Sequence, residues 1–388
     1  CLADFGAGAA TAVVASLDDG LPEAYRGNLF LADFGKRNVL RVPLVPNGAT
    51  WAVRGSNGPV RGVAGMADAE PLFQDPPEDF RPVGLAFTPD GRSLVVGDWQ
   101  HRDVKDAQAR VGRLWKLTWT GGGTPTPRPG WYVAAASGRP FGATMAELMA
   151  ALEHPSKDVR HCAQRRLSER AGSDAGLRGA LMSLASDPGR PALARIHALW
   201  ASAGSVGAGV GGGSETGAVW VRLIQDSDPR VAAQAIRAAG ESGRPEMAPP
   251  LIGALTSHSA DLRFRAATAL GRLGATAAVE SLQATLADPD DWVRYAAFQA
   301  LNRIGRRHPA AWPAVVAGLA SPNPRVVEGT AFALRATFDD ALVAALVGFR
   351  RDAQRPNAAR AAAAGLLADA CRQPPAWDGG WWAYHPFR

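Results

Sequence analysis

The most extended pattern in the chain is a repeat of apolar and small positions from about residue 145 to residue 370. In most copies an apolar residue is followed by arginine, and a small residue stands four positions after it. The copies begin 31 to 37 residues apart, at Val159, Ala194, Val231, Leu262, Val293, Val326 and Ala359. Positions 0, 4 and 8 of each copy share one helical face, so each copy predicts a helix with one buried stripe.

A further helix is predicted ahead of each of these motif helices, with a short polar turn between the two. The turns combine proline, which ends one helix, with Ser, Asp or Asn, which cap the next. The clearest first helices are expected at residues 145–154, 218–225, 278–287 and 314–320. A period in the thirties is typical of a solenoid in which helix pairs stack on one another.

These helix pairs resemble HEAT repeats, with alanine where two helices lie close. The resemblance implies an all-α solenoid over residues 143–371 with about seven helical pairs. Such solenoids present an extended concave surface, and we expect a protein partner on that face. Five repeat arginines allow two interpretations: they grip an acidic partner, or they pair with acidic turn residues and link neighbouring units. They are Arg160, Arg195, Arg263, Arg294 and Arg360.

Residues 1–119 show a different pattern of short alternating runs separated by turns. Strands are predicted near residues 28–35, 39–44, 51–53, 83–87, 93–99 and 111–119, with turns at 46–48 and 89–91. Leu-Ala-Asp-Phe-Gly occurs at 2–6 and again at 31–35, and Val-Gly-Asp-Trp at 96–99 is related. Short strands with a recurring Asp-aromatic ending predict blades of a β-propeller.

This region has room for only two to three blades, at roughly 40–50 residues each. A closed propeller needs more, and an open one leaves unpaired strand edges. We therefore expect a partial all-β propeller and a chain that is a fragment of a longer protein. Cys1 is then either a point of truncation or the lipidated first residue of a mature protein. Residues 120–142, rich in Gly and Pro, are predicted to be a linker.

Residues 21–30 and 79–91 resemble two late-blade segments of the glucose/sorbosone dehydrogenases. That family consists of six-bladed propellers that hold pyrroloquinoline quinone and oxidise sugars. Lys36 stands where the family has a lysine that holds the quinone carboxylates, and Arg81 stands at one of two arginine positions. Asp79 stands at the other. The resemblance implies Lys36 and Arg81 as cofactor-binding residues, pyrroloquinoline quinone and Ca²⁺ as cofactors of the full-length protein, and a carbohydrate substrate.

A propeller followed by a HEAT array is similar to bacterial proteins called membrane-bound dehydrogenase-domain proteins. The resemblance implies a periplasmic or extracellular location, and in many such proteins a haem c domain with a CxxCH motif follows. The tail, residues 372–388, resembles the tryptophan-rich end of their repeat region. Its cluster at Trp377–Trp382 either caps the last repeat or offers aromatic faces to a sugar or a partner.

Composition narrows the functional classes further. With 47% hydrophobic and 20% charged residues the chain has a soluble composition, and no apolar run reaches the roughly 18 residues of a membrane helix. The net charge is +6, but only four of 42 basic residues are lysines and the arginines are dispersed, which disfavours nucleic-acid binding. Three cysteines and seven histidines show no metal-ligand spacing. We therefore predict a protein-binding scaffold that is not catalytically complete by itself. The alternative is part of a quinone- or haem-linked sugar dehydrogenase.

Overall fold

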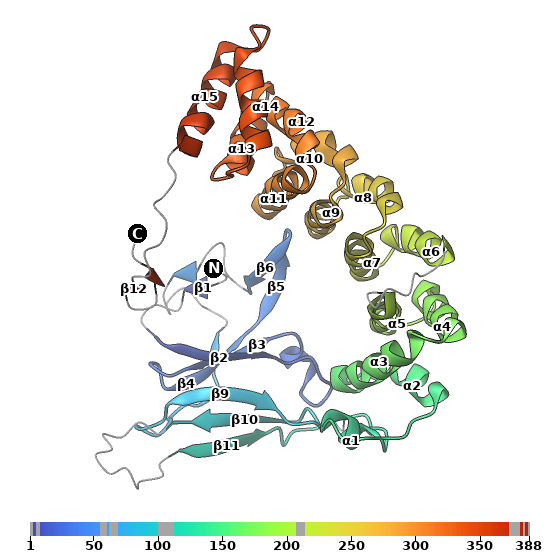
Figure 1. Ribbon diagram of the computed structural model, residues 1–388. Coiled ribbons are helices and arrows are strands. Elements are labelled where there is room, and N and C mark those ends of the chain that lie inside the picture. The colour runs from blue at the N-terminus through green and yellow to red at the C-terminus, as the bar shows by residue number, and fades with distance from the viewer. Residues whose placement is uncertain are drawn as a thin grey trace. The chain divides into compact units, whose positions relative to one another are not determined.

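Two compact units make up the chain, residues 1–212 and residues 213–388 (Figure 1). The computed structural model describes residues 3–4, 8–54, 60–61, 69–99, 112–123, 125–206, 214–371, 381–382 and 385–386. Unit 1 contains the β region and the first helices. Unit 2 contains the remaining helices and one short strand pair.

The β region of unit 1 consists of small, mostly antiparallel sheets. One sheet has the order β2-β3-β4-β8, a second has the order β11-β10-β9, β5 pairs with β6, and β1 pairs with β7 in parallel. The strands are β1 (Ala3–Asp4), β2 (Ala10–Ala15), β3 (Leu29–Asp33), β4 (Asn38–Val42), β5 (Leu44–Asn47), β6 (Thr50–Val53), β7 (Val60–Arg61), β8 (Glu70–Pro71), β9 (Pro82–Phe87), β10 (Ser93–Asp98) and β11 (Arg113–Thr118). The strands and both turns predicted from residue 28 onward are confirmed.

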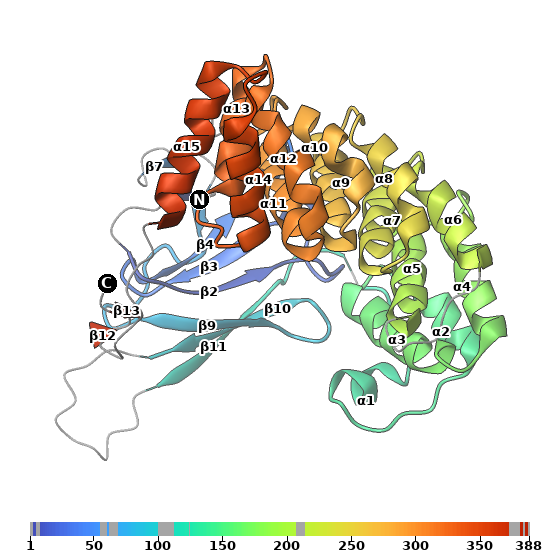
Figure 2. The same ribbon diagram turned by 45° about the horizontal axis from the view of Figure 1, so that its top comes forward.

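The two larger sheets share one apolar core, and they lie one above the other in Figure 2. Its buried members are Phe30, Val39, Phe80, Leu94 and Val96. The ring of Phe30 meets Phe87 edge-on with centroids 5.5 Å apart, which joins β3 to β9. None of the sheets formed by the described residues closes on itself. The structure therefore confirms small antiparallel sheets but not propeller blades, because a propeller requires blades arranged in a closed ring.

Within unit 1, the segment predicted as a linker contains the helix α1 (Tyr132–Ala136) and contacts both neighbours. Arg128 forms an ion pair of 2.8 Å with Asp19 of the β region. The Tyr132 hydroxyl donates to the Pro89 carbonyl at 3.2 Å. On the helical side, Ser156 Oγ donates to Asp18 Oδ1 at 2.5 Å. The helices α2 (Met145–Ala151), α3 (Lys157–Ala171), α4 (Ala175–Ser186) and α5 (Ala192–Val206) complete the unit.

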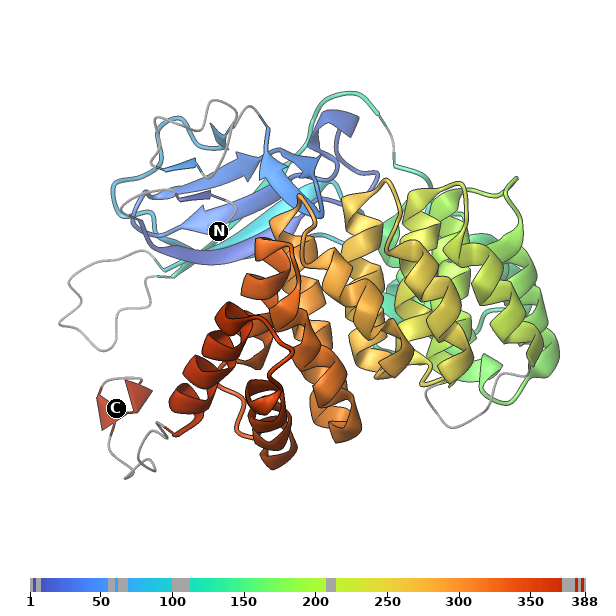
Figure 3. The same cartoon turned by 90° about the horizontal axis from the view of Figure 1, so that it is seen from above.

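Unit 2 is a solenoid of five successive helix pairs. They are α6 (Ser214–Ile224) with α7 (Pro229–Glu241), α8 (Ala248–Ala254) with α9 (Ala260–Leu273), α10 (Val279–Thr285) with α11 (Asp291–Arg307), α12 (Trp312–Ala317) with α13 (Pro324–Leu334), and α14 (Asp340–Arg351) with α15 (Asn357–Cys371). Within this unit α7, α9 and α11 lie on the inner side of the curve and α6, α8 and α10 on the outer side (Figure 1). Figure 3 shows the same helices side by side in one curved layer.

The predicted stripe is the core of the repeats. Val293, Ala297 and Leu301 at positions 0, 4 and 8 of α11 are fully buried. The predicted caps are present too: Asp228, Asp290 and Asn323 each accept a hydrogen bond from a main-chain N–H of the first turn that follows. The stripe is less complete at Leu262 and Leu367, which are half-buried, and in the last pair Leu366 is buried instead.

Neighbouring motif helices approach closely where glycine stands nine positions after the motif start. A Cβ on Gly240 of α7 would lie 2.6 Å from Ala269 Cα, and one on Gly271 of α9 would lie 2.7 Å from Ala300 Cα. Such distances are far inside van der Waals contact, so only glycine permits this spacing of α7 on α9 and of α9 on α11.

Some predictions concern residues outside the described ranges. Cys1 and the tryptophans from 377 lie there, except for the strand β12 (Trp381–Trp382), which pairs with β13 (His385–Pro386). Among the helices that are described, none is both long and apolar enough to span a membrane.

Candidate functional site

The repeat arginines stabilise the turns between paired helices. Each donates to main-chain carbonyl oxygens at or just after the end of the preceding first helix: Arg160 to His154 and Pro155, Arg195 to Ala185, Arg263 to Ser257 and His258, Arg294 to Asp288 and Pro289, and Arg360 to Arg350. Arg263 also pairs with Asp288 of the next helix pair at 2.7 Å, which is the link between units expected from the ladder interpretation. Because these guanidinium groups already bind the protein itself, they are poor candidates for gripping an acidic partner.

A strip of aromatic side chains lies on α11 and α13 instead. Trp292, Tyr295 and Phe332 are 47%, 48% and 52% exposed, although large aromatic side chains are usually buried. Tyr295 and Phe332 each meet the half-buried Phe298 edge-on, with centroids 4.6 Å apart in both pairs. Trp292 extends the strip to the first turn of α11 through Tyr295. The strip therefore links two neighbouring repeats through ring contacts.

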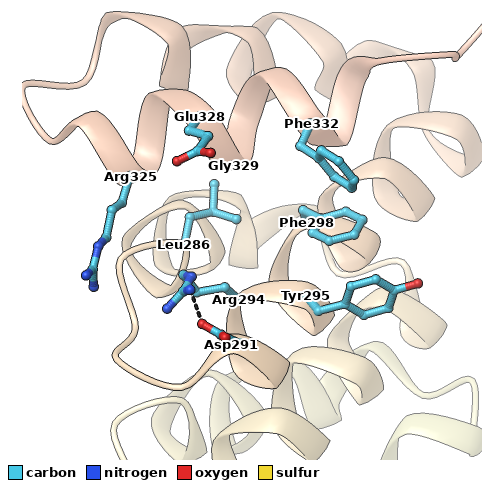
Figure 4. Close-up of a pocket in the computed structure, with 9 residues that line it drawn as sticks. All are labelled: Leu286, Asp291, Arg294, Tyr295, Phe298, Arg325, Glu328, Gly329 and Phe332. Carbon is cyan, nitrogen blue, oxygen red and sulfur yellow. Dashed lines mark hydrogen bonds and ion pairs between the residues drawn. The ribbon is translucent and has the colours of Figure 1, made fainter. Parts of the chain in front are cut away.

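A pocket of ≈ 280 Å³ opens beside this strip, between α11 and α13 (Figure 4). Tyr295 and Phe298 of α11 and Phe332 of α13 line one part of it. Leu286, at the end of α10, and Gly329 of α13 contribute to its lining. A Cβ on Gly329 would lie 2.9 Å from Leu286 Cδ2, so the missing side chain lets α13 rest against the leucine.

The remaining part of the pocket is charged. Arg294 is fully engaged, since it pairs with Asp291 and donates to the Asp288 carbonyl at 2.7 Å. Glu328 and Arg325 differ from it. The described part of the chain supplies no hydrogen bond or ion pair to the Glu328 carboxylate or the Arg325 guanidinium. One open anion and one open cation thus stand beside the aromatic strip. We call this arrangement the α11–α13 groove, formed by Tyr295, Phe298, Arg325, Glu328 and Phe332.

The groove coincides with a change in helix spacing. At the position where α7 and α9 have Gly240 and Gly271, α11 has Asn302. Its Nδ2 donates to the Ala333 carbonyl and to Thr337 Oγ1, both at 2.8 Å. A side chain therefore stands between α11 and α13, where the two preceding joints have direct contact between helices. The wider spacing leaves room for the pocket.

The two residues implied by the dehydrogenase resemblance lie at neighbouring loops of the β region. Lys36 is half-buried just after β3, and its N–H donates to Asp33 Oδ1 at 2.9 Å. Arg81 precedes β9, and its guanidinium lies 5.6 Å from the ring centroid of Phe34. The structure brings the two loops together, because Arg37 Nη1 and Arg81 Nη1 both donate to the Glu78 carbonyl, at 3.2 and 2.9 Å.

The aspartates of the Asp-aromatic pattern have a structural role in this region. Asp98 is buried and accepts from Arg81 N at 2.8 Å, from Arg113 Nε at 2.8 Å and from Trp115 Nε1 at 2.9 Å. Asp79, at the second arginine position of the resemblance, pairs with Arg113 at 2.9 Å. The negative charge of Asp79 is therefore compensated within the protein. Across the described ranges, no three His, Cys, Asp or Glu residues gather as metal ligands do.

Sequence reasoning missed the α11–α13 groove. The available signal was the aromatic residues outside the buried stripe: Tyr295 two positions after one motif start and Phe332 six positions after the next. Nothing in the sequence showed that Phe298 would join the two across a repeat boundary.

Comparisons with known proteins support the helical fold. Residues 218–302 match a family model of HEAT repeats. Similar solved structures include the CpcE–CpcF complex of phycocyanin lyase from Nostoc sp. PCC7120, at 17% identity, with 59% of this chain and 95% of that chain covered and a TM-score of 0.35. Another is an archaeal HEAT-like repeat protein from Thermococcus onnurineus NA1, at 14% identity, 60% and 98% coverage, and a TM-score of 0.34. A search of curated proteins found no match. The helical region is a HEAT/armadillo-like solenoid.

Proposed function

We propose that unit 2 is a scaffold that binds a protein partner on the inner face formed by its motif helices. The observation that carries the proposal is the α11–α13 groove, where exposed aromatic rings adjoin an open carboxylate and an open guanidinium. Aromatic residues are enriched where proteins meet, because they bury a large area at a small cost in side-chain entropy. Leaving three such rings in water is unfavourable unless a partner covers them.

Photo-crosslinking from the full-length protein in its native cells tests this proposal. A photoreactive amino acid replaces Gln299 on α11, beside the groove, or Glu280 on α10, which belongs to the outer row. We expect a discrete protein adduct from position 299 and none from position 280. Adducts of equal yield from both positions, or none from position 299, would contradict a binding role of the inner face.

A second candidate function is a quinone-dependent dehydrogenase, and it rests on the loops around Lys36 and Arg81. Two cationic side chains next to Phe34, which itself meets Trp99 edge-on at 5.9 Å, fit the anionic and aromatic character of such a quinone in part. Lys36 and Arg81 would hold its carboxylates. The quinone, when bound, supplies two-electron oxidation of a sugar hydroxyl. Arg81 is partly engaged by the carbonyls of Glu78 and Phe80, which limits this fit.

Titration of pyrroloquinoline quinone into the protein, followed by tryptophan fluorescence, tests the second candidate. If Lys36 holds a carboxylate, Lys36→Ala weakens binding about tenfold, since one charge-assisted hydrogen bond contributes roughly 1.5–3 kcal/mol. Lys116→Ala on β11 is the matched control for loss of one positive charge. Equal affinity of Lys36→Ala and the unchanged protein would remove Lys36 from the site.

A further inference from the structure

We propose that the α11–α13 groove binds an extended peptide segment with a fixed order of side chains. The order is an apolar residue, a basic residue two positions away and an acidic residue two positions beyond it. This inference rests on the proposed scaffold function and specifies the chemistry of its partner.

The spacing of the groove residues gives the first argument. Arg325, Glu328 and Phe332 are three and four residues apart on α13, so they project from three successive turns on one side of the helix. One turn advances about 5.4 Å. In an extended strand, residues two apart share a face and are separated by about 6.6–6.8 Å. Alternate side chains of an extended segment along the groove therefore come level with Phe332, Glu328 and Arg325 in turn.

The aromatic end of the groove selects the first residue. Phe298 and Phe332 present rings from two repeats, and Leu286 lies at the pocket where Gly329 has no side chain. A large apolar side chain placed here loses its contact with water and covers rings that are otherwise exposed. Aromatic and long aliphatic residues fit this position best.

The charged end selects the other two residues. Glu328 lies one turn from the apolar end, and its carboxylate has no partner among the described residues, so it favours lysine or arginine. Arg325 lies at the far end with an equally open guanidinium and favours aspartate or glutamate. Arg294 is satisfied by Asp291 and two carbonyls and does not alter this order. A peptide with the two charges exchanged would place like charges together.

A random dodecapeptide library displayed on phage and selected on the full chain tests the proposal. We expect enrichment of peptides with the apolar-x-basic-x-acidic order, read in either chain direction. For one enriched synthetic peptide, Phe332→Ala should lower affinity at least tenfold. Selection on Glu328→Lys should change the preference at the middle position from basic to acidic. Glu280→Lys on α10 reverses the same charge away from the groove and should leave the selected sequences unchanged.

The outcomes separate this inference from the scaffold function. An unchanged basic preference with Glu328→Lys, or peptides selected without charge order, would overturn the assignment while adducts from position 299 still support a scaffold. Failure to select any peptide, with those adducts present, would show that the partner presents a folded surface. Phe332 is exposed, so circular dichroism of Phe332→Ala should match the unchanged protein and exclude unfolding as the cause of lost affinity.

Discussion

In the β region of unit 1, one buried carboxylate ties distant segments together, whereas in unit 2 the same few contacts recur from one helix pair to the next. Asp98 joins the segment before β9 to β10 and β11 through Arg81, Arg113 and Trp115. In unit 2, Gly240 and Gly271 serve two successive joints in the same way.

The difference concerns how far the effect of one residue extends. A repeat contacts mainly its neighbours, so the stability of a solenoid is close to a sum of local terms. The β region has no such division, because its core and its charge cluster both draw on residues far apart in the chain. A substitution in the β region is therefore expected to affect whole sheets, and one in unit 2 a single joint.

The largest effect is expected for Asp98→Ala. It removes the partner of Arg113 and leaves Trp115 Nε1 and the Arg81 N–H without an acceptor, at a cost of about 3–5 kcal/mol. Hydrogen exchange should accelerate throughout β9, β10 and β11. Asp90→Ala, in the turn between β9 and β10, removes an exposed carboxylate and should cost about 1 kcal/mol or less. Equal effects of the two substitutions would show that the buried cluster is not the main support of this sheet.

A smaller effect is expected for Gly271→Ala in α9. The added methyl group meets Ala300 Cα at 2.7 Å, so α9 and α11 must separate, at a cost of about 1–3 kcal/mol. Gly253→Ala in α8 is the matched control, because nothing lies within 4 Å of the added methyl group. It should stabilise its helix by about 0.5–1 kcal/mol. Faster exchange should be confined to the α9–α11 joint; faster exchange across all of unit 2 would contradict the local character of the repeats.

The smallest effect, about 1 kcal/mol, is expected for Asp288→Asn, which weakens the link to Arg263. Burial alone would raise the pKa of Asp288, but the hydrogen bonds from Arg263 and from the Asp290 N–H outweigh it and hold the pKa below 3.8. Stability from this group is thus present above pH 3.8 and is lost as the pH falls through the lower pKa of the folded state. The difference between Asp288→Asn and the unchanged protein, measured by urea unfolding, should shrink below pH 3.8. A difference that is constant from pH 7 to pH 3 would argue against an ionic contribution.

The comparison also explains which features the sequence could predict. The motif helices were predictable because Val293, Ala297 and Leu301 encode their buried stripe locally, and Asp290 encodes the start of the helix. The strands were predictable from alternation. Closure into a propeller was not, because it depends on how sheets associate, and the sheets seen here show only small antiparallel units.

The groove was not predictable for a related reason. Tyr295 and Phe332 are visible in the sequence as aromatic residues off the buried stripe, but their use depends on Phe298 meeting Phe332 from another repeat. Likewise, the open charge of Glu328 could be recognised only once Arg294 was seen to be occupied by the turn before α11.

The position nine residues after each motif start has a consequence for how such arrays diversify. Glycine there closes a joint and asparagine at residue 302 holds it apart, while the buried stripe remains the same. A lineage can thus gain or lose a recognition groove at one chosen joint by changing one residue, and the other joints keep their inherited geometry. Duplicated repeats that differ at this position would already supply selection with a set of surfaces on one unaltered framework.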